Sequence, residues 1–180
     1  MAFGEFEAAL VDLPQQLGET IPDFHNMELR ARQLKEAVQN NPVKRLSVVE
    51  SMVEELNRNM EEMCKAEQLH RDGKLPKRIC HCDTKVNNMM FDADGNILCV
   101  IDLDTVMPSY VFSDYGDFLR TGANFTAEDD PNLANVGFNM DIFKAFTKGY
   151  LTSAGAFLTP IEREHLPFAA KFRAYFSDYL

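Results

Sequence analysis

Apolar residues recur at helical spacing along the first 73 residues of the chain. The first stripe consists of Phe6, Ala9, Leu10, Leu13 and Leu17 and is followed by Pro22. The second stripe consists of Met27, Ala31, Leu34 and Val38 and stops at Asn40-Asn41-Pro42. Apolar positions three or four residues apart are typical of a helix with one face in the core, and proline interrupts such a helix. The pattern therefore predicts two core-facing helices.

A third, longer helix is expected up to Gly73. Ser47 and Glu50 have the spacing of a capping box, in which each side chain satisfies a backbone N–H at the start of a helix. The apolar stripe that follows consists of Val49, Met52, Val53, Leu56, Met60 and Met63. A methionine-rich stripe at this spacing indicates ordinary core packing.

The pattern changes to short extended pieces over residues 74–106. Three β-strands are predicted at 79–82, 88–91 and 97–102, and the polar turn 92–96, which contains Gly95, joins the last two. The turn has acidic residues like those of an EF-hand calcium loop, but that loop needs Gly at its sixth position and Glu at its twelfth, where this chain has Ile97 and Leu103. We therefore predict a β-hairpin.

Helical signals return in residues 107–180. An Asp- and Gly-bearing segment and an acidic loop at 128–130, expected to be solvated or to approach a substrate, precede a helix with Phe143, Phe146 and Tyr150 on one face. Thr159, Pro160 and Glu162 have the order of a helix cap, a first-turn proline and a capping box. The whole chain is expected to form one α+β, mainly α domain, divided into 1–73 (helical), 74–106 (extended) and 107–180 (helical).

Composition narrows the class of protein. Acidic residues outnumber basic ones 28 to 18, for a net charge of −10, which disfavours binding to nucleic acid. The sequence contains no apolar run long enough to cross a membrane and starts with acidic rather than basic residues, so we expect no membrane partner and a cytoplasmic location. The Cys80-His81-Cys82 cluster would point its sulfurs and its imidazole to opposite faces of an extended chain, which argues against zinc.

Three polar residues around the predicted hairpin indicate a chemistry. Asp83 precedes the hairpin, Asn88 follows five residues later, and Asp102 ends an apolar strand. Transfer of a phosphoryl group from a nucleotide needs a carboxylate beside the acceptor hydroxyl and oxygen ligands that hold Mg²⁺ against the phosphates. Taken alone, Asp102 and Asp104 would also suit a metal-dependent glycosyltransferase or a simple turn cap. Together with Asp83 and Asn88 they favour phosphoryl transfer.

The order H-x-D-x-x-x-x-N, followed by an apolar strand and Asp, resembles the catalytic loop and metal strand of protein kinases and of the aminoglycoside phosphotransferase and choline kinase families. The match extends to GETIPDFHN (18–26), HCDTKVNNMMFD (81–92) and IDLDTVMPSYVFSDYGDFLRTGAN (101–124). These segments are similar to N-acetylhexosamine 1-kinases and their bacterial relatives in the phosphotransferase enzyme family. The resemblance implies the large, C-terminal lobe of a kinase-like fold whose small β-hairpin carries the metal ligands.

The resemblance also implies roles for individual residues. Asp83 would orient the acceptor hydroxyl and accept its proton, and Lys85 would contact the transferred phosphoryl group. Asn88 and Asp102 would bind Mg²⁺ and thereby ATP, and Asp104 would add a ligand because alternation along a strand puts it on the same face as Asp102.

Supporting roles follow from the same resemblance. His81 would pack and form hydrogen bonds rather than act as a base. Asp114 and Asp117 would hold the catalytic loop through backbone hydrogen bonds. Arg120 and Asn124 are candidates for contacts to the acceptor.

Kinase-like phosphotransferases also need a small lobe with a glycine-rich loop and a strand lysine, and no segment of this sequence has that pattern. We therefore expect the small lobe of the same parent protein as a partner, with ATP, Mg²⁺ and a sugar as ligands. The expected reaction is phosphorylation of the anomeric hydroxyl of an N-acetylhexosamine. Two alternatives stay open: a noncatalytic fragment that binds a sugar or a partner, and a kinase of choline, homoserine or an aminoglycoside.

Overall fold

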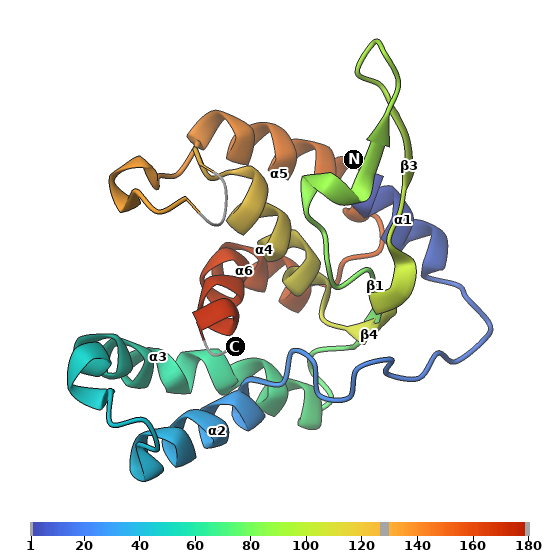
Figure 1. The fold of residues 1–180 in the computed structure, drawn as a ribbon. Helices are drawn as coiled ribbons and strands as arrows, with labels where there is room; N and C mark the ends of the chain where they lie inside the picture. Colours follow the sequence, from blue (N-terminus) through green and yellow to red (C-terminus); the bar gives the residue numbers. More distant parts are fainter. Residues whose placement is uncertain (1, 127–129, 179–180) are drawn as a thin grey trace.

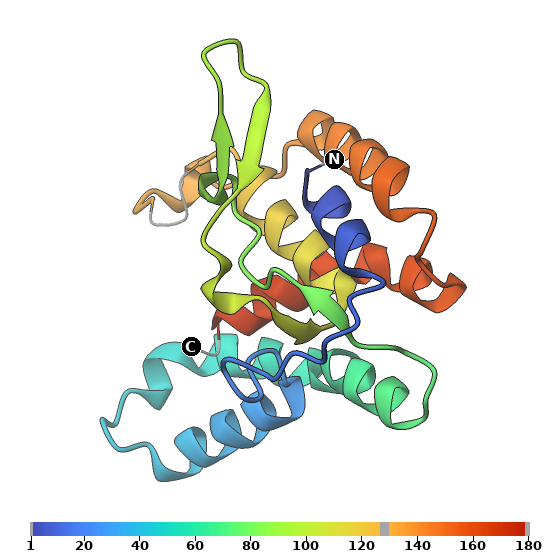
Figure 2. The same ribbon diagram turned by 90° about the vertical axis from the view of Figure 1, so that its right-hand side faces the viewer.

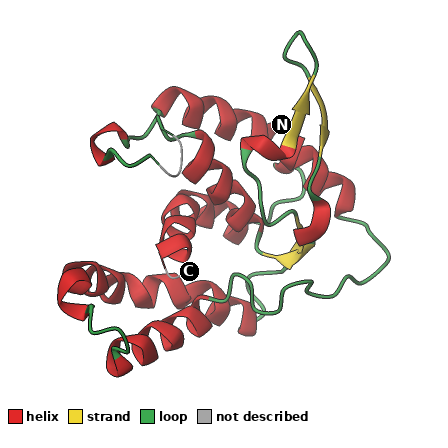
Figure 3. Ribbon diagram, viewed as in Figure 1, coloured by secondary structure: helices red, strands yellow, loops and turns green. Residues whose placement is uncertain are grey.

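The computed structural model describes residues 2–126 and 130–178, and it is mainly helical (Figures 1 and 3). Two separate antiparallel pairs of short strands, β1 with β4 and β2 with β3, lie among the helices. In chain order the elements are α1 (Ala2–Leu10), α2 (Met27–Asn40), α3 (Leu46–Arg71), β1 (Arg78–Cys80), the 3₁₀ turn η1 (Val86–Asn88), β2 (Met89–Phe91), β3 (Ile97–Val100), η2 (Leu103–Thr105), β4 (Met107–Ser109), α4 (Val111–Gly122), η3 (Leu133–Asn135), α5 (Met140–Ala154) and α6 (Pro160–Asp178). The predicted α+β, mainly α class is confirmed.

Helix α4 forms the centre of the molecule, with α6, α5 and the β1–β4 pair around it (Figure 2). Every residue from Val111 to Leu119 is buried, so this helix has no solvated face. Gly116 allows α6 to approach closely, because a Cβ atom at this position would lie 2.2 Å from the backbone oxygen of Ala169. Aromatic rings fill the space around α4, including the pair Phe112 and Phe172, whose ring centroids are 5.1 Å apart. Sequence reasoning assigned no separate helix to this Asp- and Gly-bearing stretch, although Val111, Phe112, Tyr115, Phe118 and Leu119 recur at helical spacing.

The first predicted helix is wrong in its length. Helix α1 ends at Leu10, whereas the apolar stripe was expected to continue to Leu17. Pro14 explains the difference, because proline has no N–H to donate within a helix and its ring clashes with the preceding turn. The second predicted helix is confirmed as α2, and Asn41 ends it in the left-handed conformation with φ 36°.

The long third helix is confirmed as α3, but two predicted details are wrong. Ser47 is the second residue of the helix rather than its cap, so the predicted capping box does not form. The apolar stripe is buried only in its second half, at Leu56 and Met63, whereas Met52 is 57% exposed. The first half of α3 extends beyond the body of the molecule beside α2 (Figure 1).

The predicted hairpin is confirmed as β2 and β3, with Met90 opposite Cys99, and it projects from the body in both ribbon views (Figures 1 and 2). All three predicted strands are shorter than expected, and the second begins at Met89 because Asn88 belongs to the 3₁₀ turn η1. The first ends at Cys80, because Cys82 adopts a left-handed φ of 68°, and the third ends at Val100, because Asp102 has φ 63°. The alternation assumed for Cys80 to Cys82 therefore does not apply. Strand β4, the partner of β1, was not predicted.

The helices predicted in the last third of the chain are confirmed, together with their capping and packing residues. Thr159 and Glu162 form the predicted capping box, with the backbone N–H of Thr159 2.7 Å from Oε2 of Glu162. Phe146 and Tyr150 of α5 pack on the centre of the fold as expected. Of the acidic loop 128–130, only Asp130 lies within the described residues. Among the helices described, none is both long and apolar enough to cross a membrane.

Candidate active site

The loop between β1 and η1 brings three of the predicted site residues together. Asn88 is buried, and its Nδ2 donates to both the backbone oxygen (2.8 Å) and Oδ2 (2.9 Å) of Asp83. Lys85 places its Nζ 2.9 Å from the same Oδ2. The Asp83 side chain is 28% exposed, so one carboxylate is held from two sides yet remains accessible.

These contacts determine the charge state of Asp83. Burial by itself would raise the pKa of this carboxyl group, but the hydrogen bonds from Lys85 and Asn88 outweigh burial and lower it. The same hydrogen bond from Lys85 to Asp83 raises the pKa of the lysine. Asp83 is therefore an anion and Lys85 a cation at neutral pH.

The segment that carries Asp102 is tied to this loop by His81 and Asn88. The backbone oxygen of Asn88 accepts from the N–H of Ile101 (2.9 Å), and Nε2 of His81 lies 2.9 Å from the oxygen of Ile101. Since a carbonyl can only accept, the histidine proton is on Nε2. The ring of His81 is fully buried against Phe3 and Phe6. Its contacts are those of the predicted packing and hydrogen-bonding residue.

The strand geometry assumed for Asp104 is wrong. Regular strand pairing stops at Val100, Asp102 is left-handed, and the residues after it form the 3₁₀ turn η2. Alternation of faces holds only along extended backbone, so it cannot put Asp104 beside Asp102. A role for Asp104 in binding a metal stays a prediction.

The donor atoms in this region suit Mg²⁺. Because Asn88 uses Nδ2 to hold Asp83, its amide oxygen is the atom left for a metal. Asp102 and Asp104 add carboxylate oxygens, and both side chains are exposed. Mg²⁺ prefers oxygen ligands of this kind.

Two aspartates of α4 hold the loop from below. Asp114 accepts the backbone N–H groups of His81 (2.6 Å) and Cys82 (2.8 Å), one on each carboxylate oxygen. Asp117 accepts the N–H of Thr84 at 2.9 Å. The predicted structural role of both aspartates is confirmed.

Asp117 is in turn held by two arginines. Its Oδ1 accepts from Nη2 of Arg173 at 2.7 Å and from Nη2 of Arg120 at 3.0 Å. Arg173 is buried and also donates to Nε2 of His25, whose Nδ1 lies 3.2 and 3.0 Å from the hydroxyl oxygens of Ser109 and Ser113. Because an arginine cannot accept, His25 carries its proton on Nδ1, and burial together with the charge of Arg173 lowers its pKa.

Sequence reasoning missed Arg173 and His25 as supports of the site. His25 stands in the segment 18–26, which Glu19 fastens to Lys77 through a 2.9 Å ion pair. An isolated histidine or arginine on a helical stretch shows no sequence pattern of its own. The similarity of the segment 18–26 to the phosphotransferase enzyme family was the one sequence feature that could have pointed to His25. The segment therefore braces the loop indirectly, through Arg173 and Asp117.

The two candidates for acceptor contacts are both engaged within the fold. Arg120 bonds to Asp117, and Oδ1 of Asn124 accepts from the N–H groups of Thr126 and Gly137. A part for either side chain in acceptor binding stays a prediction.

Comparison with known proteins gives one family and several solved structures. The family model described as "Phosphotransferase enzyme family" matches residues 2–150. An aminoglycoside phosphotransferase from Streptomyces rimosus, solved in complex with ADP and streptomycin, is 12% identical with a TM-score of 0.51, and the match covers 99% of this chain and 61% of that one. A second structure of that enzyme is 14% identical, with the same TM-score and coverage. A choline kinase from Cryptosporidium parvum is 15% identical with a TM-score of 0.45, and the match covers 98% and 54% of the two chains.

The match to the Streptomyces rimosus structures shows a shared kinase-like fold. This chain spans 61% of their length, so the activity, substrates and partners of a whole protein are matters of proposal.

Proposed function

Because this chain belongs to the phosphotransferase enzyme family, we propose that its parent protein transfers the γ-phosphoryl group of ATP to a hydroxyl group of a small molecule. The observation that carries the proposal is the constellation around Asp83, where Asn88 fixes the carboxylate and Lys85 stands beside it with a positive charge. The proposal includes a small lobe of the same parent protein that completes the nucleotide site.

Asp83 would orient the acceptor hydroxyl and take its proton. A carboxylate with a lowered pKa is a weak base, but phosphoryl transfer through a loose transition state needs little help in deprotonating the nucleophile and gains mostly from its positioning. Lys85 would release Asp83 for the transferred phosphoryl group, because its Nζ can rotate away from the carboxylate toward a stronger anion.

Asn88 and Asp102 would hold Mg²⁺, with Asp104 as a further oxygen ligand. When bound, this ion would neutralise the charge of the β- and γ-phosphates. The hydrogen bond from the N–H of Ile101 to the backbone oxygen of Asn88 keeps the two ligand-bearing segments side by side.

As the acceptor we propose the anomeric hydroxyl of an N-acetylhexosamine, on the strength of the segments 18–26, 81–92 and 101–124. A kinase of another small alcohol or amine is the second candidate, because a protein of the same fold was solved with ADP and streptomycin. A panel of N-acetylglucosamine, N-acetylgalactosamine, choline, homoserine and streptomycin separates the two. Faster turnover of any of the last three than of the hexosamines would overturn the sugar assignment.

The variant Asp83→Asn in the full-length parent protein tests the chemistry. We expect kcat to fall by about 10²- to 10⁴-fold, the usual contribution of a positioned proton acceptor, while the KM for the acceptor changes little. Asp94→Asn, the same change in the exposed hairpin turn, is the matched control and should keep full activity. Unchanged kcat in Asp83→Asn would refute the assignment.

A further inference from the structure

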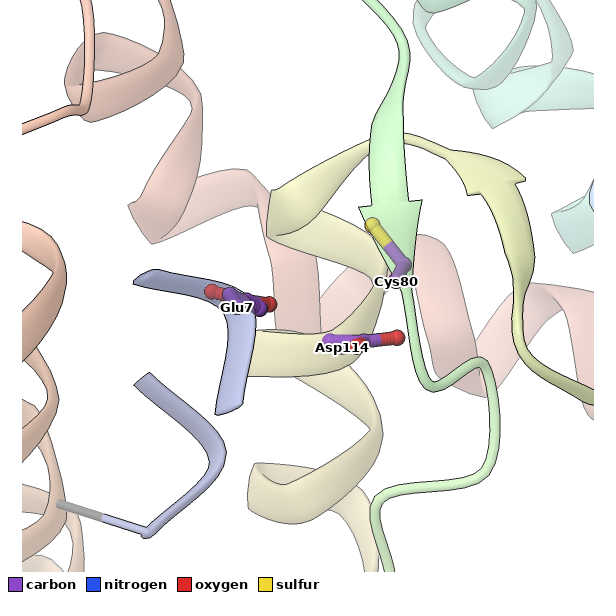
Figure 4. A group of neighbouring side chains, drawn as sticks. All are labelled: Glu7, Cys80 and Asp114. Atoms are coloured by element: carbon purple, nitrogen blue, oxygen red, sulfur yellow. The ribbon is translucent and has the colours of Figure 1, made fainter. Parts of the chain in front are cut away.

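Three side chains outside the proposed reaction meet in the core beside the end of β1, where the catalytic loop begins (Figure 4). Glu7 comes from α1, Cys80 from β1 and Asp114 from α4, and one oxygen or sulfur atom of each lies within 4.8 Å of the others. All three residues are at most 2% exposed. Two carboxyl groups thus share a buried site, and their ionisation states cannot be independent.

The hydrogen bonds around this site leave one oxygen without a donor. Both carboxylate oxygens of Asp114 accept backbone N–H groups, and Oε2 of Glu7 accepts from the hydroxyl of Tyr150 at 2.6 Å. Oε1 of Glu7 is buried and accepts no N–H or O–H from any residue that the structure describes. Burying a carboxylate oxygen without a hydrogen-bond donor costs free energy. A protonated carboxyl group avoids this cost, because its own O–H can donate a hydrogen bond.

The charged and titratable groups that face Glu7 do not stabilise a second negative charge. The charge of Arg78 interacts with Glu7 and Cys80, but this side chain already forms a fork onto Glu162, with distances of 2.6 and 3.1 Å. The titratable groups that act on Glu7 are Tyr150 from α5, Cys80 and Arg78 from β1, Asp114 from α4 and Glu162 from α6. The ring of His81 packs on Phe3 and Phe6 of α1, and β3 adds the exposed thiol of Cys99. Two adjacent carboxylates without a dedicated cation hold one proton between them.

We propose that Glu7 is a positioning residue: it carries a proton at neutral pH and donates it through Oε1 to Asp114, so that Asp114 stays a singly charged anchor for the catalytic loop. Burial raises the pKa of Glu7 well above its ordinary value, in accord with this geometry. Burial also raises the pKa of Asp114, to about 6, but the two backbone N–H groups it accepts oppose that rise. The shared proton therefore resides on Glu7.

The position of Asp83 depends on this proton. Asp114 holds the backbone of His81 and Cys82, the two residues before Asp83. Loss of the proton from Glu7 would put two carboxylates side by side and push Asp114 away from those N–H groups. Rising pH should then weaken the hydrogen bonds from the N–H groups of His81 and Cys82 to Asp114. The groups that would touch the substrate would not themselves change.

The variant Glu7→Gln is the main test, because glutamine can accept from Tyr150 with Oε1 and donate to Asp114 with Nε2 whatever the pH. The 180-residue chain and its variants are unfolded with urea between pH 5 and pH 8. Wild-type Glu7 is protonated in the folded state and ionised in the unfolded state over this range. The unfolding constant of wild type relative to Glu7→Gln should therefore rise about tenfold per pH unit until the folded-state pKa of Glu7 is reached.

Glu5→Gln, the same change at an exposed position of α1, is the matched control. The proposal would be overturned if the unfolding constant of wild type relative to Glu7→Gln did not change with pH. It would also be overturned if wild type relative to Glu5→Gln gave the same slope with pH. Failure of Glu7→Gln to fold would also overturn it, since a neutral donor is what the proposal requires at this position.

Infrared spectroscopy of the folded chain at neutral pH gives an independent reading. We expect the carbonyl band of a protonated carboxyl group, and its loss in Glu7→Gln. An absent band would contradict the shared proton. A metal ion is the competing occupant: if Zn²⁺ raises the Tm of the wild type and Cys80→Ser abolishes the rise, a metal replaces the proton and the proposal fails.

A kinetic consequence rests on the proposed function. In the full-length parent protein, Glu7→Gln should weaken the fall of kcat at alkaline pH and leave the KM for the acceptor unchanged. The spectroscopic and unfolding measurements need no activity, so a failure of the proposed reaction would leave them standing.

Discussion

Removal of Arg173 is expected to destabilise the fold severely, because it is the buried partner of the buried carboxylate of Asp117. Breaking a buried ion pair by removing one partner costs about 3 to 5 kcal/mol. Arg173 is 4% exposed and its Nη2 lies 2.7 Å from Asp117. Arg120 remains 3.0 Å from the same oxygen, so Arg173→Met should cost about 3 kcal/mol, at the lower end of that range. For a chain of this size the loss corresponds to a fall in Tm of about 6 to 12 °C.

The chain offers a matched control for this prediction. Arg71 also forms a two-pronged ion pair, with both distances to Glu28 at 2.7 Å, but its side chain is 50% exposed. Exposed pairs are screened by water and contribute little to stability, so Arg71→Met should lower Tm clearly less than Arg173→Met does. Urea and thermal unfolding followed by circular dichroism measure both variants. Equal losses in the two would refute the view that burial gives the Arg173 pair its importance.

Two further substitutions test the packing and the helix caps. Gly116→Ala should destabilise the chain by about 1 to 3 kcal/mol, because its Cβ would lie 2.2 Å from the backbone of Ala169. The control Gly18→Ala, with no atom within 4 Å, should be neutral or slightly stabilising. Comparable Tm values for the two variants would contradict the close approach of α4 and α6. Thr159→Ala should lower the free energy of unfolding by about 1 kcal/mol, because the capping box of α6 is lost. Ser47→Ala should leave it unchanged, because Ser47 caps no helix. Urea unfolding that ranks the two variants in the opposite order would show the caps to be misassigned.

The fold could be predicted from the sequence where local signals act alone. The spacing of apolar residues and the Asn-Pro, Gly and Thr-Pro signals gave helices α2, α3, α5 and α6, and the Asp-rich turn gave the hairpin. Prediction failed where distant parts of the chain decide. The polar side of helix α4, which carries Asp114 and Asp117, is buried because α6, α5 and the β1–β4 pair surround the helix. Met52 is exposed because the first half of α3 extends beyond the body of the molecule beside α2 (Figure 1).

In the candidate site, too, contacts that are local in sequence could be predicted and distant ones could not. Asp83, Lys85 and Asn88 are close in sequence, so their spacing was enough to predict that they would meet. The supports of the loop come from positions up to 148 residues apart, as for the contact of His25 with Arg173, and no local pattern links them. Glu7 belongs to no motif in the sequence, although its side chain is only 2% exposed in the fold. Long-range pairing of buried charges can be found only when the fold is known.

Backbone strain connects these buried supports to the exposed site. Cys82, next to Asp83, has φ 68°, and Asp102 has φ 63°. A left-handed backbone costs a residue other than glycine about 1 to 3 kcal/mol, less for Asp and more for Cys, which has no local hydrogen bond to offer in return. The N–H of Cys82 is held 2.8 Å from Asp114, and its side chain is fully buried. The anchor on α4 therefore keeps the loop in a conformation that the residues at its turn would not adopt alone, and the direction of Asp83 depends on Asp114 as well as on its direct partners Asn88 and Lys85.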